Sequence, residues 1–248
     1  MEQDYYADYA QLQDSHWWFR GRRRIVEAVL TRELGDPGAA GSRTILDVGC
    51  GTGSMLPLLA RFGAAQGVDT EPQAIALCHE RGLDAASLYD GSRLPFDDDA
   101  FDVACAFDVI EHIRDDVGAL RDMSRVVRPG GLLVLTVPAF PFLWGPQDEI
   151  SHHERRYTRP TLRAAIAAAG ADLRHMSFFN TLLFPPIAAV RVLRPARPGD
   201  ELKSDFTLTT PPAVNTALAR LFGAEAPVVA RTGLPFGVSL LAVARVRG

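Results

Sequence analysis

The stretch from Ile45 to Ser54, with the sequence ILDVGCGTGS, constrains the fold of this chain more than any other. A short apolar run contains an acid and is followed by glycines at alternate positions, namely Asp47, Gly49, Gly51 and Gly53. The run is typical of a buried parallel strand, and residues 55–62 are expected to form the helix that follows it. Glycines allow the backbone to turn tightly at the carboxyl end of a strand, where a side chain would block a ligand. Open α/β sheets bind ligands there, so the stretch predicts a binding site.

The glycine spacing distinguishes between classes of ligand. A dinucleotide-binding loop has the pattern G-x-G-x-x-G or A. In this chain the third glycine comes one residue early, at Gly53, and Ser54 occupies the last position. The resulting pattern D-x-G-x-G-x-G disfavours a nicotinamide oxidoreductase. One glycine-rich loop is weak support on its own, so the function depends on what the following strands carry.

Composition narrows the class of protein further. The length of 248 residues predicts one domain with room for a subdomain. The net charge of −4 argues against a nucleic-acid binder, which usually has a basic domain. Three cysteines without C-x-x-C spacing, Cys50, Cys78 and Cys105, are expected to be buried reduced thiols. The sequence shows no leader with a cationic and then an apolar part, and no apolar run long enough to span a bilayer. It therefore predicts a cytoplasmic protein.

From Thr44 onward, predicted strands and helices alternate, which indicates a parallel sheet. The strands that follow 44–48 are expected at 65–69, 85–89, 101–107, 132–137, 172–179 and 236–246. Helices are expected at 71–81 and at 160–169, and a further helix is expected after the strand 101–107 and ends at residue 127. The fold class is therefore α/β, with a Rossmann-like core over residues 44–179 and a final strand within 235–248.

Two segments lie outside this core. Residues 1–43 contain an apolar helical pattern over 25–34, preceded by Trp17, Trp18 and Phe19 and by a run of arginines. The aromatic rings either pack against the core or form a lid over a cofactor, with an arginine on its carboxylate. Residues 180–234 form a long insertion with an apolar piece at 182–193 and a predicted helix at 213–222. Because long ordered connections are usually functional, the insertion is interpreted as a cap.

Further signals follow the later strands. Asp69 ends the second strand, Asp90-Gly91 follows the third, and the fourth runs through Phe107-Asp108 into Glu111-His112. The turn Arg128-Pro129-Gly130-Gly131 precedes the fifth strand. Each of these has an ordinary structural explanation: an acid can cap a helix or a turn, and Pro-Gly-Gly is a tight turn. Their order and spacing together are much more specific.

These motifs, over about residues 44–179, closely resemble the class I S-adenosylmethionine (SAM) dependent methyltransferases, in the subgroup of ubiquinone, menaquinone, small-molecule and glycan methyltransferases. The resemblance implies a seven-stranded, mostly parallel sheet with an antiparallel last strand. It also implies SAM as cofactor and S-adenosylhomocysteine as product. On this basis Asp47 is assigned to the methionine amino group, Gly49 and Gly51 to the methionyl part, Asp69 to the ribose and Asp90 with Gly91 to the adenine. Gly53, Phe107 and Asp108 complete the predicted cofactor site.

Histidines are the candidates for catalysis, because an oxygen acceptor needs a base with a pKa near the working pH. His112 belongs to the matched Glu111-His112 pair, and His153 lies in the run 148–158 after the fifth strand. Many related sequences carry a D…H-x-R-R-Y pattern here, which favours His153 and Tyr157. A hydrogen-bonded turn or a solvated charge run is the alternative. A metal is a further alternative, because acids and imidazoles crowd in this run, but no zinc-type spacing such as H-E-x-x-H appears and no metal ligand is assigned.

The predicted activity is methyl transfer from SAM to an O, N or C nucleophile of a lipid-like, natural-product or sugar acceptor. A non-catalytic SAM-binding protein is the alternative, followed by a nicotinamide oxidoreductase. No nucleic-acid partner is expected, and the absence of an N-P-P-Y-type motif after the fourth strand agrees with this. The apolar segment 182–193 would allow contact with a membrane surface, and the chain is expected to be a monomer or a homodimer.

Overall fold

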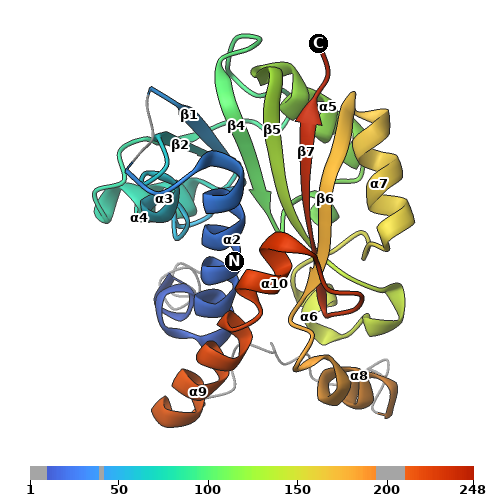
Figure 1. Ribbon diagram of the computed structural model, residues 1–248. Coiled ribbons are helices and arrows are strands. Elements are labelled where there is room, and N and C mark those ends of the chain that lie inside the picture. Colours follow the sequence, from blue (N-terminus) through green and yellow to red (C-terminus); the bar gives the residue numbers. More distant parts are fainter. Residues whose placement is uncertain (1–9, 39–41, 194–209) are drawn as a thin grey trace.

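The structure is a computed structural model that describes residues 10–38, 42–193 and 210–248 (Figure 1). Its elements are α2 (Trp17–Leu34), β1 (Thr44–Val48), α3 (Leu56–Leu59), β2 (Ala64–Asp69), α4 (Pro72–Glu80), β3 (Ala86–Leu88), β4 (Phe101–Phe107), the 3₁₀ helix η1 (Ile110–His112), α5 (Asp116–Val126), β5 (Val127–Pro138), the 3₁₀ helix η2 (Pro141–Leu143), α6 (Pro146–Ile150), α7 (Arg159–Ala168), β6 (Ala171–Phe179), α8 (Phe184–Leu193), α9 (Pro212–Gly223), α10 (Ala226–Arg231) and β7 (Ser239–Val246).

The strands form a seven-stranded sheet in the order β3-β2-β1-β4-β5-β7-β6. β1 pairs in parallel with both β2 and β4, and β4 pairs in parallel with β5. Only β7 runs the other way, because it is antiparallel to both β5 and β6. The predicted Rossmann-like sheet with an antiparallel last strand is confirmed, and the carboxyl ends of β1, β4 and β5 meet at one edge of the sheet.

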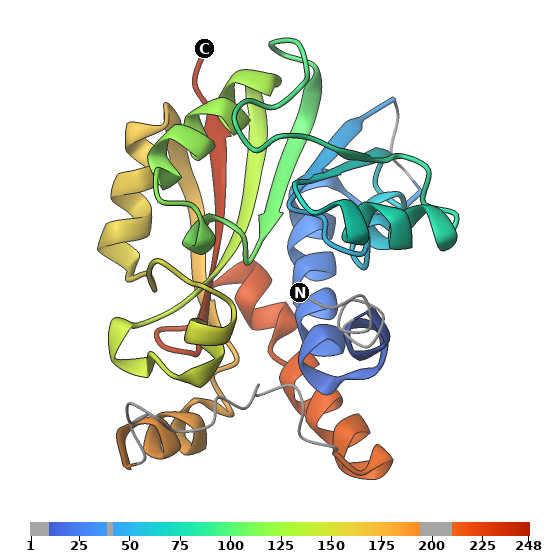
Figure 2. The same ribbon diagram turned by 180° about the vertical axis from the view of Figure 1, so that it is seen from behind.

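Helices cover both faces of the sheet, and each face has its own core. α2, α9 and α10 lie on the face toward the viewer in Figure 1, where Ile25, Phe62 and Phe222 belong to one buried cluster. α5 and α7 lie on the face seen in Figure 2, where Leu120 and Ile166 belong to the other. Because the central strands are covered on both sides, they are almost continuously apolar, as buried parallel strands require.

Several predicted boundaries differ from the structure. The helix expected over 55–62 is one turn, Leu56–Leu59, because turns at 60–63 end it. β5 begins at Val127 instead of 132: the Pro-Gly-Gly turn lies within the strand, beside a register shift between Phe101 and Val103. α2 begins at Trp17, where the predicted pattern began at 25, because the His16 side chain accepts a hydrogen bond from the Trp18 N–H as an N-cap.

The insertion divides into two parts. α9 and α10 pack against α2, and α10 was not predicted. The Asn215 side chain accepts a hydrogen bond from the Trp17 N–H at 2.7 Å, and the Phe222 ring lies 5.9 Å from that of Trp17. α8 lies apart from them, near η2 (Figure 1). Residues 194–209 of the predicted cap lie outside the described residues.

Two expectations about the whole chain can be compared with the described residues. All three cysteines are buried and free, as predicted. Within residues 10–38, 42–193 and 210–248, none of the helices has both the length and the hydropathy needed to cross a bilayer.

Candidate functional site

A cavity of about 280 Å³ lies at the carboxyl ends of β1, β4 and β5. From the core it is lined by Asp47, Gly49, Gly51, Phe107 and Asp108, all predicted cofactor residues. The N-terminal segment adds Gln13, Trp18, Phe19 and Arg22, and the segment after β5 adds Gln147, Ser151, His153 and Arg156. We call one group of lining residues the glycine-loop end (Arg22, Asp47, residues 49–54 and Asp108) and another the imidazole end (Glu111, His112 and His153).

The three glycines of the loop, Gly49, Gly51 and Gly53, have different structural roles. All have positive φ angles, 69° at Gly49, 54° at Gly51 and 76° at Gly53, which disfavour any side chain. A Cβ on Gly51 would meet nothing within 4 Å, because that position faces the open cavity. A Cβ on Gly53 would lie 2.5 Å from Leu83 and 3.0 Å from Cys78. Gly53 therefore permits close packing of the loop, and it does not line the cavity.

Buried charge dominates the glycine-loop end. Asp47 is 2% exposed, and burial raises its pKa to about 8, although Arg22 opposes this shift. Arg22 is also buried, donates to the Asp108 carboxylate and lies 4.7 Å from the Trp18 ring centroid. Asp108 has a φ of 59°, a strained conformation for a residue with a side chain, which is typical of functional sites. This end can hold a ligand that carries both a cation and a carboxylate.

The other predicted cofactor residues lie outside the lining. Asp69 accepts hydrogen bonds from the N–H groups of Gly51 at 2.7 Å and Glu71 at 2.9 Å. Its carboxylate thus holds the glycine loop in place. Asp90 accepts from the Ser92 N–H and hydroxyl, which together lower its pKa, so it caps a turn. A Cβ on Gly91, with φ of 79°, would lie 3.1 Å from Thr70. The ribose and adenine assignments of these residues stay predictions.

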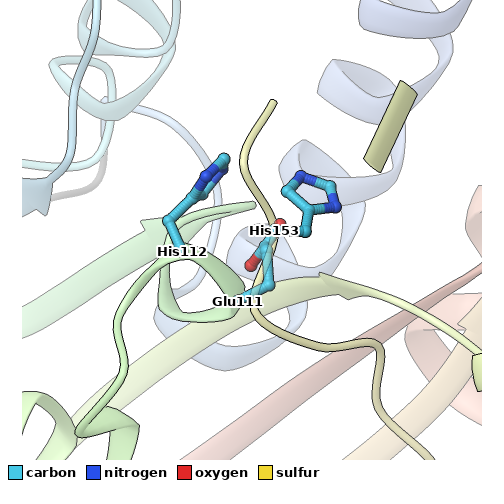
Figure 3. Close-up of side chains that lie close together, drawn as sticks. All are labelled: Glu111, His112 and His153. Atoms are coloured by element: carbon cyan, nitrogen blue, oxygen red, sulfur yellow. The ribbon is translucent and has the colours of Figure 1, made fainter. Parts of the chain in front are cut away.

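At the imidazole end, η1 and the segment after α6 bring together groups that are far apart in the sequence (Figure 3). The rings of His112 and His153 are 4.6 Å apart and nearly perpendicular. Burial, and next the charge of His153, lower the pKa of His112 to about 4. Glu111 is fully buried, and burial followed by the nearby Asp108 raises its pKa well above the usual range. The two predicted catalytic histidines thus share one end of the cavity.

Comparison with known proteins decides the family. Residues 46–135 match the methyltransferase domain family. A demethylmenaquinone methyltransferase of Tropheryma whipplei is 31% identical over 156 residues, which are 61% of this chain and 55% of that protein. A ubiquinone biosynthesis O-methyltransferase of Serratia proteamaculans is 32% identical over 129 residues, 47% of this chain and 54% of the relative. Residues 46–135 of this chain therefore belong to the methyltransferase domain family.

A solved structure agrees about the fold. A SAM-dependent methyltransferase of Archaeoglobus fulgidus has a TM-score of 0.54 at 19% identity, over 90% of this chain and 94% of that one. At this identity the likeness concerns the fold alone. The chain spans about half the length of the curated relatives it matches, so the substrates of those relatives do not follow for this methyltransferase domain.

A rigid support holds His153 at the imidazole end of the cavity. Its Nδ1 lies 2.8 Å from an oxygen of Asp148, which is fully buried. Arg156 donates to both oxygens of Asp148, at 2.8 and 2.9 Å, and the Gly145 N–H donates at 2.8 Å. Burial raises the pKa of Asp148, but the bonds from His153 and Arg156 outweigh this and leave it lowered. Asp148 is therefore an anion that fixes the His153 ring.

Tyr157, which the sequence pattern favoured together with His153, is not part of the site. It is 2% exposed within a core cluster, and its hydroxyl donates to Asp116 at 2.6 Å. Burial and that bond raise its pKa. Its role is structural, because the residue pairs as a bridge with Ala139 and so fixes the segment that carries His153.

Sequence reasoning did not assign several residues of this site. Glu111 was identified only as the partner of His112, and Arg22 only as one member of an arginine run. An acid next to a matched histidine was a usable signal for Glu111. Nothing in the run from Arg20 to Arg24 distinguishes Arg22, because its burial depends on α9 and α10 holding α2 against the sheet.

Proposed function

We propose that this chain transfers the methyl group of SAM to a nucleophilic atom of a small molecule. The observation that carries the proposal is the charge of the glycine-loop end, where the buried Asp47 and the half-buried Asp108 face one arginine, Arg22. SAM carries a sulfonium, an ammonium and a carboxylate, and these three groups fit two acids and a guanidinium. A dinucleotide brings two phosphate charges, which the same acids would repel.

The loop geometry also fits SAM. The open space at Gly51 allows a ligand to approach the backbone closely, and Gly49 and Asp47 would hold its methionine part. When bound, SAM supplies a methyl carbon made electrophilic by its sulfonium. The chain's own contribution is to align the acceptor with that carbon and to exclude water. Trp18 and Phe19 serve the exclusion, because both line the cavity from α2.

The imidazole end is the place for the acceptor. His112 and His153 line the same cavity as the glycine loop, and we assign them to the acceptor's reacting group. His153 is oriented by the buried Asp148, as a base is oriented by a carboxylate in other enzymes. An acceptor hydroxyl is the group that such a pair handles best, so oxygen is the favoured nucleophile.

Residues 1–43 act as the lid in this proposal, and the insertion 180–234 supports it. No described residue of the insertion lines the cavity, whereas α9 and α10 pack on α2, which does.

Phe222 is fully buried between the rings of Trp17 and Phe179, so Phe222→Ala should destabilise the fold by about 3–5 kcal/mol. Replacing residues 183–209 by a Gly-Ser linker leaves α9 and α10 in place and should spare SAM binding. Urea unfolding and SAM titration measure the two effects, and a linker variant that cannot bind SAM would contradict this division of roles.

Calorimetric titration tests the cofactor part of the proposal. SAM and S-adenosylhomocysteine should bind, and NAD should bind at least about 100-fold more weakly, a difference of about 2.7 kcal/mol. Tighter binding of NAD would overturn the proposal. Methyl-labelled SAM, offered with hydroxylated small molecules, then separates an enzyme from a non-catalytic SAM-binding protein, since only an enzyme moves the label to the acceptor.

A further inference from the structure

The imidazole end holds three groups in the arrangement of a metal site. Glu111, His112 and His153 each offer one ligand atom, and these atoms all lie within 4.8 Å of one another. In Figure 3 the Glu111 carboxylate points toward the space between the two rings. The spacing of these residues in the sequence gave no hint of this, because η1 and the segment after α6 meet only in the folded chain.

Glu111 is the most informative of the three. Its side chain is fully buried, and neither of its carboxylate oxygens accepts a hydrogen bond from any residue that the structure describes. An unpaired buried carboxylate is strongly unfavourable. The guanidiniums closest to it are engaged elsewhere, Arg22 with Asp108 and Arg156 with Asp148. A cation between the rings would supply the missing partner.

Each imidazole has a partner on its outer side. His153 Nδ1 donates to the Asp148 carboxylate at 2.8 Å, and the His112 ring donates to the backbone carbonyl of Ser151. This leaves one nitrogen lone pair on each ring. Histidines that bind metals almost always donate their other N–H to a carboxylate or a carbonyl, which fixes the ring and its tautomer. Both outer contacts needed for a metal site are therefore in place.

We propose that Glu111, His112 and His153 bind one divalent cation of the zinc type, with an open coordination position facing the cavity. Two imidazoles and one carboxylate are the ligands of open catalytic zinc sites, whereas magnesium prefers oxygen ligands. Tetrahedral bonds of 2.0–2.1 Å place ligand atoms about 3.3 Å apart, so side-chain rotations must close at most about 1.5 Å. This inference rests on the proposed function, because it gives the open position to the methyl acceptor.

The cation defines the class of acceptor and the step it undergoes. A hydroxyl oxygen of the acceptor occupies the open position, where the cation lowers its pKa. Because His112 and His153 bind the cation in this state, they position the oxygen and do not act as bases, and the proton passes to water. The oxygen then forms a bond to the methyl carbon while the carbon–sulfur bond breaks. The electron pair of that bond stays on sulfur, so neutral S-adenosylhomocysteine leaves. Alcohols and phenols fit this step, and a carbon nucleophile without a ligating oxygen does not.

Zinc binding by the full chain tests the site directly. Protein freed of metal with a chelator is titrated calorimetrically with Zn²⁺, and with Co²⁺ to record the visible absorption that a tetrahedral site produces. We expect one equivalent to bind. Glu111→Gln and His153→Asn should each weaken binding at least 100-fold. Asp148→Asn, which keeps all three ligands, should weaken it by about 10–100-fold, the range for an outer-shell partner.

The neighbouring His152 provides a matched control. It is exposed, has a φ of 54° that asparagine tolerates, and is not one of the three ligands, so His152→Asn should bind Zn²⁺ like the parent chain. Equal zinc binding by the parent and Glu111→Gln would overturn the metal site, as would the absence of stoichiometric binding. A SAM titration of every variant shows which of them are folded. A parent chain that binds SAM but no zinc refutes this inference alone, whereas a parent chain that does not bind SAM refutes the proposed function.

Discussion

The two ends of the cavity are built in different ways. The backbone of the glycine-loop end lies in one continuous strand–loop–helix unit that also carries Asp47, whereas Arg22 and Asp108 reach this end from α2 and from the end of β4. The imidazole end is assembled from η1 and from residues 145–156, which follow different strands. The backbone conformation of the glycine-loop end is therefore determined by neighbouring residues in the sequence, whereas the imidazole end depends on the packing of several elements. The following predictions test whether the two ends are as independent as this suggests.

The largest expected effect is at Gly51. Gly51 and Gly82 both have positive φ angles, 54° and 72°, and both have open space where a Cβ would lie, but only Gly51 lines the cavity. Valine at either position should add similar backbone strain, about 1–2 kcal/mol. Gly51→Val should also lower SAM affinity by at least about 100-fold, because its side chain occupies ligand space. Titration and urea unfolding of both variants measure this, and equal affinities would place the cofactor elsewhere.

The same contrast explains what could be predicted from the sequence. The glycine spacing predicted the strand, the turn and the ligand end, because each needs only local backbone geometry. The seven-stranded, mostly parallel sheet and the antiparallel β7 followed from the resemblance and are confirmed. Tyr157, which the motif favoured, lies outside the cavity lining, because its burial against Asp116 cannot be seen in a motif. Arg22 and Glu111 were missed as site residues because tertiary packing alone removes them from solvent.

The second-largest effect on SAM affinity is expected for Asp69, which supports the glycine-loop end but does not itself line the cavity. Asp69→Ala removes the acceptor for two backbone N–H groups, and hydrogen bonds to a charged group are worth about 1.5–3 kcal/mol, or roughly 10–100-fold in SAM affinity. If Asp69 acts by holding the loop, a SAM analogue without ribose hydroxyls loses as much affinity as SAM. If it binds the ribose, as the resemblance implies, the analogue loses less. Titration of both ligands distinguishes the two roles.

A smaller effect concerns Asp47 and pH. Its folded pKa is about 8, above its unfolded value, so its contribution to stability is fully present in acid and is lost as the pH rises through about 8. A cationic ligand favours the carboxylate, so SAM binding should release protons near pH 7. Affinity should rise from pH 6 to 7.5, by up to about tenfold per pH unit if one proton is released. Asp47→Asn should remove both effects.

Calorimetry in two buffers with different heats of ionisation measures the released protons. The matched variant is Glu111→Gln, which neutralises a buried acid at the other end of the same cavity. Unchanged proton release in Asp47→Asn would mean that a different group ionises when SAM binds.

The smallest effect is expected for Glu111→Gln in the metal-free protein. The folded pKa of Glu111 is raised, chiefly by burial, so its contribution to stability is lost as the pH rises toward that pKa. Glutamine has nearly the same shape and no charge to desolvate. In a chelator-containing buffer, the variant and the parent chain should have the same free energy of unfolding near pH 5. At pH 9 the variant should be more stable by about 1–2 kcal/mol, which is only part of the cost of burying a charge. Urea unfolding at both pH values measures the difference.

SAM affinity should stay within about threefold of the parent value, since Glu111 belongs to the imidazole end. A variant that is less stable at pH 9, or that loses SAM affinity as Gly51→Val does, would show that the two ends form one coupled unit.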